Sequence, residues 1–141
     1  MNKIHQISAE HLSIEQIGEI IKNGTKLELS EDARQRIIRC REYLDNKIKE
    51  SETPIYGVTT GFGSLCKISI DKDSLSQLQK NLVMSHACGV GDRVPNEIVK
   101  IMLLLKIQSL SYGYSACQLK TVERLIDFFN NDIYPIVYMQ G

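Results

Sequence analysis

The sequence predicts a mainly α-helical protein with one irregular, glycine-rich loop. Apolar residues recur at the spacing of one helix face in about five segments, and capping residues or glycines bound these segments. Between residues 51 and 70 the helical period disappears, and a proline and several glycines follow one another closely. Because 141 residues suffice for one buried core and no linker or repeat interrupts them, we expect a single helical segment over residues 1–141.

The first two helices have clear start signals. Ser13 and Gln16 form a capping-box pattern, which predicts a short amphipathic helix that ends at the following Asn-Gly pair. Residues 26–29 are expected to be briefly extended. Ser30 can then cap a second helix, which continues to about Glu50 and carries acidic residues in its first turn, where the helix dipole favours them.

Three further helices follow the loop. The third is expected to begin at Asp73-Ser74 and to end near Gly89. Pro95 suits the first position of the fourth helix, which is apolar nearly all round and closes at Gly113, so we expect other helices to surround it. Ser115 is expected to cap the last helix.

The end of the chain is expected to be extended and uncapped. An Asn-Asn pair and a Tyr-Pro pair stop the last helix, and residues 133–141 are then largely apolar. We find nothing after this segment with which it could pair or pack.

Charge and hydropathy exclude several kinds of partner. Lys plus Arg and Asp plus Glu are each 17, so no net positive field attracts nucleic acid or an anionic membrane. The apolar run at residues 98–110 is interrupted by polar residues and falls short of the roughly 20 residues that a membrane span needs. The first residues hold no apolar stretch of signal-peptide length, and we therefore expect a cytoplasmic protein.

A metal centre is not expected. His5 and His11 have no acidic or cysteine partners at ligand spacing. The cysteines are too widely spaced for a CxxC pair and too sparse for a disulfide framework, so we interpret them as reduced, mostly packed thiols: Cys40, Cys66, Cys88 and Cys117.

Residues 54–63 are the segment most able to carry chemistry. Three glycines within seven residues permit backbone geometries that let a loop approach a ligand closely. The segment has no GK[ST] ending, which argues against a phosphate loop. Tyr56 offers a phenol that can serve as a general base or proton donor, whereas composition alone favours a tyrosine that packs its ring and hydrogen-bonds its hydroxyl.

His86, at the end of the third helix, is the second candidate. Residue chemistry alone favours a satisfied core histidine or a C-terminal helix cap. The alternative is a polar contact within a ligand pocket.

Three blocks resemble a known family. Residues 56–63 read Tyr-Gly-Val-Thr-Thr-Gly-Phe-Gly, residues 78–91 contain Met-Ser-His-Ala-Cys-Gly-Val-Gly, and residues 104–115 end in Ser-Tyr-Gly-Tyr-Ser. In this order they resemble the aromatic amino-acid ammonia-lyases and aminomutases that use a methylidene-imidazolone group. The resemblance covers roughly residue 29 to the end and implies the helical N-terminal domain of the ammonia-lyase (fumarase/aspartase-like) fold.

The resemblance also implies roles for individual residues. Tyr56 takes the position of the family's proton-transferring tyrosine, and Gly63 would help to shape the site. The histidine-specific members carry a Ser-His pair, as this chain does at Ser85 and His86, so histidine is the implied substrate. Thr59 stands where many bacterial histidine lyases carry Asn and plant phenylalanine-specific enzymes carry Thr, which is a departure from the histidine-specific pattern.

The implied reaction is the non-oxidative deamination of L-histidine to trans-urocanate and ammonia by a homotetramer. The family forms its methylidene-imidazolone from an internal Ala-Ser-Gly tripeptide, which this sequence does not contain. We therefore expect a chain truncated before the cofactor site and inactive alone. The alternatives are a tyrosine or phenylalanine ammonia-lyase or aminomutase of the same family, and a non-catalytic, truncated helical module that binds an amino acid or a partner subunit.

Overall fold

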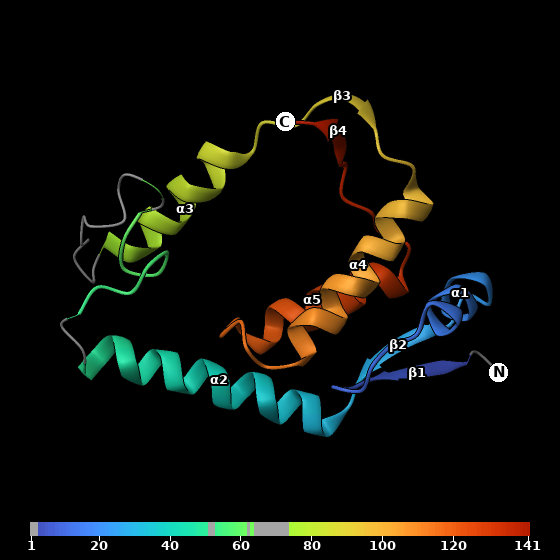
Figure 1. The fold of residues 1–141 in the computed structure, drawn as a ribbon, viewed down its shortest axis with the longest axis horizontal. Helices are drawn as coiled ribbons and strands as arrows, with labels where there is room; N and C mark the ends of the chain where they lie inside the picture. The colour runs from blue at the N-terminus through green and yellow to red at the C-terminus, as the bar shows by residue number, and fades with distance from the viewer. Residues whose placement is uncertain (1–2, 51–52, 62, 64–73) are drawn as a thin grey trace. The chain divides into compact units, whose positions relative to one another are not determined.

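The computed structural model describes residues 3–50, 53–61, 63 and 74–141. Within these residues the fold is mainly helical, with short strands between the helices (Figure 1). The chain separates into two compact units: unit 1 comprises Met1–Asp45 and Arg93–Val137, and unit 2 comprises Asn46–Asp92 and Tyr138–Gly141.

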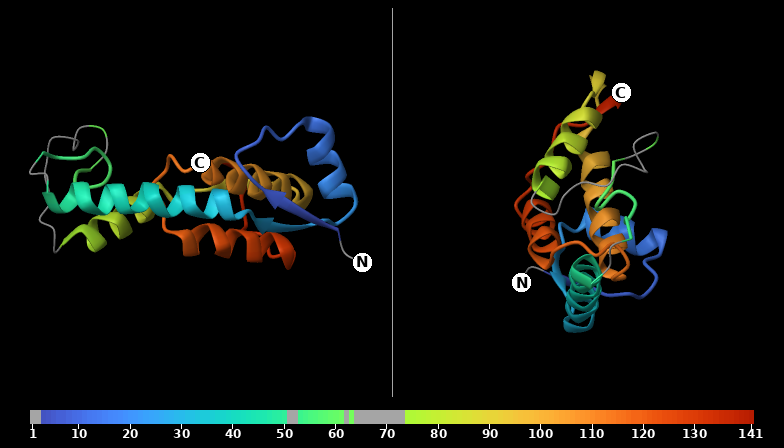
Figure 2. Two further views of the ribbon diagram at one scale, coloured as in Figure 1. Left: turned by 90° about the horizontal axis from the view of Figure 1, so that it is seen from below. Right: turned by 90° about the vertical axis from the view of Figure 1, so that its left-hand side faces the viewer.

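Unit 1 begins with a parallel β-α-β arrangement. Strand β1 (Ile4–Ile7) pairs with strand β2 (Lys26–Leu29) in parallel register, from Ile4 opposite Lys26 to Ile7 opposite Leu29. Parallel strands need a crossover, and helix α1 (Ile14–Lys22) supplies it (Figure 2). The sequence predicted β2 but not β1, whose four residues show no distinct period.

The predicted starts of the first two helices are confirmed. At α1 both hydrogen bonds of the capping box form, since the Gln16 N–H donates to Ser13 Oγ at 3.2 Å and the Ser13 N–H donates to Gln16 Oε1 at 2.8 Å. Helix α2 (Glu31–Glu50) begins after Ser30, whose Oγ accepts the Ala33 N–H at 3.2 Å. Both helices therefore begin where side chains satisfy exposed N–H groups.

Helices α4 (Asn96–Ser111) and α5 (Leu119–Asn130) lie side by side and cover the small sheet of unit 1 (Figure 1). Their buried faces join those of β1, β2, α1 and α2 in one apolar core: Ile7, Ile20, Leu27, Leu29, Ala33, Ile37, Leu103, Leu104, Ile107, Leu110, Val122, Ile126 and Phe129. Burial of this many large apolar side chains is the main stabilising term of the unit.

Within the described residues, one face of helix α4 is buried and the other is partly exposed, and the expectation that other helices surround it stays a prediction. Ile98, Met102 and Leu105 are 49%, 46% and 45% exposed. An apolar groove of about 530 Å³ runs along this face and is lined by Val99, Met102, Leu103, Leu105, Lys106, Ser109, Pro135 and Val137. Among the described residues outside α4, only Pro135 and Val137 line this groove.

Helix α5 begins later than the sequence predicted. Ser115 was expected to cap it, but the helix starts at Leu119, with Gln118 at the N-cap position and no side-chain capping bond. Ala116, between α4 and α5, has a φ of +50°. This left-handed conformation is incompatible with a helix that continues through it. Gly113, with a φ of +76°, closes α4 as predicted.

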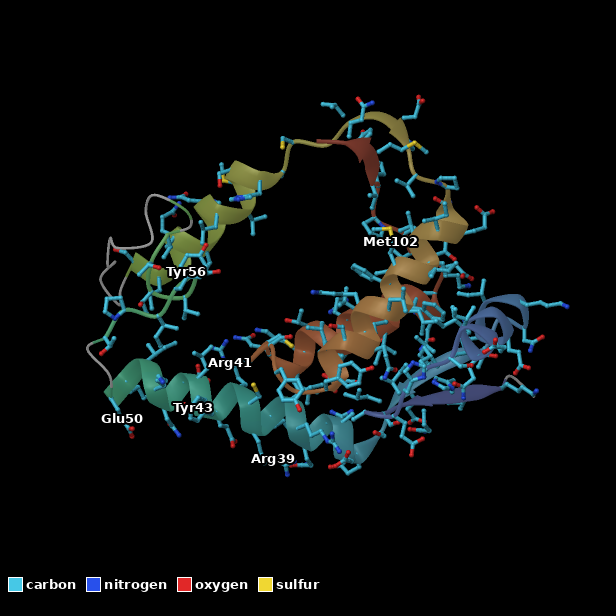
Figure 3. All side chains as sticks on the ribbon, viewed as in Figure 1. Arg39, Arg41, Tyr43, Glu50, Tyr56 and Met102 are labelled. Carbon is cyan, nitrogen blue, oxygen red and sulfur yellow. The ribbon has the colours of Figure 1, made fainter. Side chains whose placement is uncertain are left out.

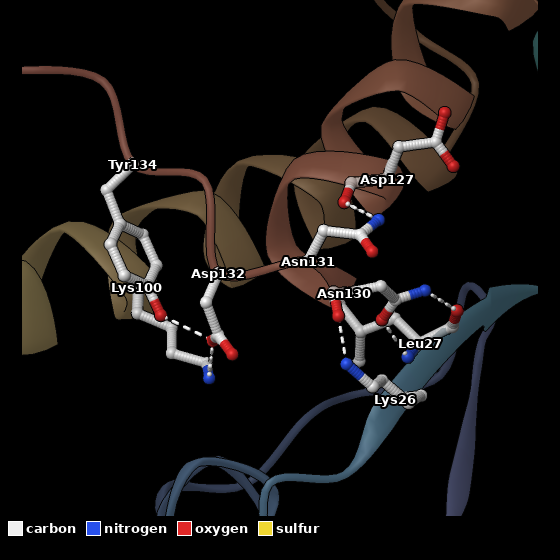
Figure 4. Close-up of polar contacts among 8 residues, drawn as sticks. All are labelled: Lys26, Leu27, Lys100, Asp127, Asn130, Asn131, Asp132 and Tyr134. Carbon is white, nitrogen blue, oxygen red and sulfur yellow. Dashed lines mark hydrogen bonds and ion pairs between the residues drawn. The ribbon is translucent and has the colours of Figure 1, made fainter.

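Polar bridges fasten α5 to the sheet (Figure 4). The Asn130 side chain accepts the Leu27 N–H at 2.7 Å and donates to the Leu27 carbonyl at 2.8 Å, so that one amide satisfies both backbone groups of that strand residue. The Lys26 ammonium donates to the Asn130 carbonyl.

A second bridge joins α4 to the segment after α5. Lys100 Nζ lies 2.7 Å from Asp132 Oδ1, and the Tyr134 hydroxyl donates to the same oxygen at 2.6 Å (Figure 4). These two donors lower the pKa of the Asp132 carboxyl. Burial opposes the charge on Lys100, but the hydrogen bonds and charges of Asp132 and Tyr134 raise its pKa overall.

Unit 2 contains helix α3 (Leu75–His86), most of strand β3 (Val90–Arg93) and strand β4 (Tyr138–Gln140). Strands β3 and β4 pair in a two-stranded sheet. The end of the chain was expected to be extended, which is confirmed for β4, and its pairing partner precedes it in the sequence, at residues 90–93. Gly89 allows this approach, since a Cβ there would lie 2.8 Å from the Tyr138 ring.

Candidate active site

The glycine-rich loop is ordered by its own backbone over residues 55–61. The Val58 and Thr59 N–H groups both donate to the Ile55 carbonyl, at 3.0 and 2.9 Å. Gly57 has a φ of +69°, a left-handed conformation that a residue with a side chain adopts only with strain. The segment is therefore a tight turn with Tyr56 inside it, within the region that the sequence predicted to be a structured, irregular loop.

Two threonine hydroxyls close the turn. Thr59 Oγ1 accepts the Ile55 N–H at 2.8 Å, and Thr60 Oγ1 accepts the Gly57 N–H at 3.2 Å. Thr60 is fully buried, and its hydroxyl donates to the Gly61 carbonyl at 3.1 Å. The hydroxyls thus satisfy backbone groups on either side of Tyr56 and hold its position along the chain.

Helix α3 anchors the same turn. Gln79 Nε2 donates to the Gly57 carbonyl at 3.2 Å. This contact joins the residue after Tyr56 to the helix that carries Ser85 and His86 at its end. Sequence reasoning missed Gln79, since its partner lies 22 residues away and no local pattern marks it.

The Tyr56 side chain is exposed. Its exposed fraction is 64%, so the ring is not packed into a core, contrary to the interpretation that composition favoured (Figure 3). The hydrogen-bonded turn thus places a largely exposed phenol at a defined position along the chain. This arrangement is suited to proton transfer at the phenolic oxygen.

His86 is the last residue of α3 and is exposed. Its Nδ1 lies 2.9 Å from the carbonyl oxygen of Leu82, one helical turn earlier. The ring is thus held against the last turn of the helix. It is not a core histidine.

Ser85 lies beside His86 and is also exposed. Its Oγ donates to the same Leu82 carbonyl at 2.9 Å and lies 3.0 Å from His86 Nδ1. The hydroxyl and the imidazole are thus organised together by a single backbone carbonyl.

Gly63 has a φ of +55°, so glycine is favoured there on backbone grounds. A Cβ at this position would meet no atom within 4 Å among the described residues. Its role in shaping the site stays a prediction.

The predicted site residues Tyr56, Gly63, Ser85 and His86 all belong to unit 2. None of them lines the apolar groove on α4. None lines the polar hollow of about 390 Å³ beside β1 and α1 either. Convergence of the phenol and the imidazole on one pocket stays a prediction. The part of the predicted loop at residues 64–70 lies outside the described residues.

No cluster of metal-ligating side chains occurs among the described residues. Cys40, Cys88 and Cys117 carry free thiols; Cys88 is exposed, whereas packed thiols were expected, and Cys66 lies outside the described residues. None of the helices in the described parts of the chain has the length and apolar character needed to cross a membrane.

Comparison with known proteins gives a consistent set of relatives. The profile of the family described as "Aromatic amino acid lyase" matches residues 12–141. The histidine ammonia-lyase of Deinococcus radiodurans is 46% identical over 130 residues, which are 92% of this chain and 25% of that protein. The histidine ammonia-lyase of Streptococcus gordonii is 36% identical over 141 residues, 100% of this chain and 27% of that protein. The chain spans about a quarter of the length of these relatives.

Solved structures of the same group share the fold. An ergothionase from Treponema denticola superposes with a TM-score of 0.92 at 27% identity, covering 99% of this chain and 28% of that chain. The tyrosine aminomutase of Streptomyces globisporus gives 0.89 at 28% identity, with 100% and 26% covered. The histidine ammonia-lyase of Trypanosoma cruzi gives 0.84 at 28% identity, with 99% and 26% covered. These similarities confirm the predicted helical N-terminal part of the ammonia-lyase fold.

Proposed function

The chain belongs to the aromatic amino acid lyase family, and on this premise we propose that it is the N-terminal part of a histidine ammonia-lyase. The parent polypeptide, meaning the longer chain that would contain these residues, eliminates ammonia from L-histidine and forms trans-urocanate. The observation that carries this proposal is identity of 46% and 36% to histidine ammonia-lyases over 92% and 100% of the chain. The Ser85-His86 pair supports the same substrate.

In this proposal Tyr56 moves a proton at its phenolic oxygen during the elimination. Its exposure and the threonine and Gln79 contacts of its turn support that role. His86 forms a directional hydrogen bond with the substrate imidazole, aided by Ser85, and Gly63 leaves room for the substrate. A buried imidazole without such a partner would lose about 1–3 kcal/mol of binding free energy.

The described residues fit a site whose electrophile comes from elsewhere in the parent polypeptide. They present a phenol and an imidazole, but the sequence contains no Ala-Ser-Gly from which a methylidene-imidazolone forms. When present, that group supplies the electrophile that activates the substrate for loss of ammonia. We further propose a cytoplasmic homotetramer for the parent polypeptide.

Urocanate absorbance provides the direct test. The purified 141-residue chain should form no urocanate from L-histidine, because the electrophile is missing. The parent polypeptide should form it steadily. Turnover by the 141-residue chain alone, or no turnover by a parent polypeptide that contains the tripeptide, would contradict the proposal.

The alternative within the family is a tyrosine or phenylalanine ammonia-lyase or an aminomutase. It is supported by the structural similarity to the tyrosine aminomutase, at 28% identity, and by Thr59, which departs from the histidine-specific pattern. Substrate profiling of the parent polypeptide separates the two, because a histidine-specific enzyme should show a far lower kcat/KM with phenylalanine. A non-catalytic helical binding module would instead bind an amino acid without releasing ammonia.

A further inference from the structure

Two free cysteines lie on neighbouring segments of unit 1. Cys40 is on α2, and Cys117 is in the segment between α4 and α5, called here the connecting segment (residues 112–118). Both residues are half-buried, and Cys117 packs against the apolar core. Cys88, in contrast, is exposed and belongs to unit 2. The two half-buried thiols are thus nucleophiles to which the proposed lyase site assigns no role.

Two contacts hold the connecting segment along α2. A Cβ at Gly113 would lie 2.8 Å from the Arg36 Cβ, so the segment passes directly against that turn of the helix. About one turn further on, the Arg41 guanidinium donates to the Ala116 carbonyl at 3.4 Å. The connecting segment therefore follows the stretch of α2 that contains Cys40.

Cys40 faces this segment. It lies four residues after Arg36, and residues spaced by four share one side of a helix. It immediately precedes Arg41, just as Cys117 immediately follows Ala116, so the contacts at Arg36 and Arg41 bracket it. The two thiols are near enough to interact electrostatically. The fold thus brings together two sulfhydryl groups from segments that are far apart in the sequence.

The surroundings of the pair favour thiol chemistry over metal binding. Burial is the largest cause that raises the pKa of the Cys117 thiol, and the Cys40 thiol raises it further, whereas Lys106 and Arg41 lower it. The described residues hold no group of three or more metal-ligating side chains, so the pair has too few ligands for a metal centre. Oxidation to a disulfide is the reaction that two adjacent thiols can complete by themselves, given an oxidant.

We propose that Cys40 and Cys117 form a redox-sensitive pair, which a low-molecular-weight disulfide oxidises to an intramolecular disulfide between α2 and the connecting segment. In the first step the Cys40 thiolate attacks one sulfur of glutathione disulfide, and one glutathione leaves. In the second step Cys117 gives its proton to solvent and attacks the Cys40 sulfur, which displaces the second glutathione. Two protein thiols are oxidised, and one glutathione disulfide is reduced to two glutathione thiols.

The disulfide stabilises unit 1, because it closes a long loop and restricts the unfolded chain more than the folded one. In a reducing compartment both residues remain thiols, and the bond forms when the thiol–disulfide balance becomes more oxidising. The candidate active-site residues belong to unit 2, and oxidation of the pair does not depend on the proposed lyase activity.

The test uses the 141-residue chain with the other two cysteines replaced (C66S/C88S), folded and incubated with glutathione disulfide. Mass spectrometry should show the loss of two hydrogens and no bound glutathione, and tryptic mapping should join the peptides of Cys40 and Cys117. Addition of C117S leaves Cys40 alone, and the reaction should stop at a glutathione mixed disulfide. Glutathione retained on the two-thiol chain, or two unmodified thiols, would overturn the proposal.

Two arginine variants in the same background test the geometry that brings the thiols together. R41Q removes the guanidinium that holds the Ala116 carbonyl and should slow closure of the disulfide several-fold. R39Q is the matched control, because Arg39 also adjoins Cys40 in the sequence but is exposed on another side of α2 (Figure 3). It should leave the rate unchanged. Equal rates in the two variants would contradict the role of the connecting segment.

Thermal unfolding gives a second readout. The oxidised C66S/C88S chain should have a Tm about 5–15 °C above that of the reduced chain, and dithiothreitol should abolish the difference. The mixed disulfide of the C117S variant closes no loop and should give no such increase. A Tm that does not rise although the Cys40–Cys117 bond has formed would remove the stabilising role from the proposal.

Discussion

The two units of the chain differ in how they hold their residues. In unit 1, side chains from six helices and strands bury one another, and Ile7, Leu104, Ile107 and Val122 have no exposed surface. In unit 2, α3 has no buried residue, and hydrogen bonds to the backbone place the candidate site residues. Apolar packing therefore stabilises unit 1, whereas local hydrogen bonds orient the candidate site residues of unit 2.

The side chains that stabilise the fold are therefore different from those proposed to act on the substrate. Removal of a core side chain should lower the free energy of unfolding, whereas removal of a site side chain should lower turnover and leave folding almost unchanged.

The Tyr56→Phe substitution in the parent polypeptide should lower kcat by about 10²–10⁴-fold, because the proton-transferring oxygen is lost. The free energy of unfolding should change by less than about 0.5 kcal/mol, since the side chain is 64% exposed. Urocanate kinetics and urea unfolding measure the two effects. A large loss of stability with unchanged kcat would reverse the comparison for this residue.

The Leu104→Ala substitution should destabilise the 141-residue chain by about 2–5 kcal/mol, because it opens a cavity at a residue that is 0% exposed. The matched control is Val83→Ala on α3, where the side chain is 70% exposed and the expected cost is within about 0.5 kcal/mol. Urea unfolding followed by circular dichroism compares the two variants. Similar costs would show that α3 is packed more tightly than its exposure indicates.

The Asn130→Ala substitution should cost about 1–3 kcal/mol, because both backbone groups of Leu27 lose their partner. Asn131→Ala is the control, since Asn131 is exposed and makes only a local bond to the Asp127 carbonyl within α5. Hydrogen exchange at Leu27 measures the effect at the bond itself. Unchanged exchange in Asn130→Ala would show that the amide bridge does not protect the strand.

The Lys100–Asp132 pair should contribute less than about 1 kcal/mol, because Asp132 is largely exposed and solvent screens the charge. The lowered pKa of Asp132 gives stability that is present above the carboxyl's unfolded pKa and is lost as pH falls through the folded value. The raised pKa of Lys100 gives stability that is present below its unfolded pKa and is lost as pH rises through the folded value.

The difference in unfolding free energy between wild type and Asp132→Asn should therefore be largest between about pH 5 and pH 9 and shrink at both extremes. Urea unfolding across this range measures it. A difference that is constant with pH would show that the two charges are not coupled.

Signals that lie within a few neighbouring residues were predictable from sequence alone. The capping box at Ser13, the cap at Ser30, the stop at Gly113 and the tight turn around Tyr56 all depend on contacts within about one turn of chain. The family blocks are local in the same sense, and they mark His86 as a candidate site residue.

Only the tertiary structure decided the contacts between distant segments. Asn130 and Leu27 are 103 residues apart, and the Gln108 amide donates to the carbonyls of Ser8 and Glu10 about as far away along the chain. Strand β4 pairs with β3, and α4 buries one face and leaves the other partly exposed. The local spacing of apolar residues specifies neither outcome. A hydrogen-bonding or apolar group does not specify its distant partner, because many partners of the same chemistry exist and the packing of the whole chain selects one.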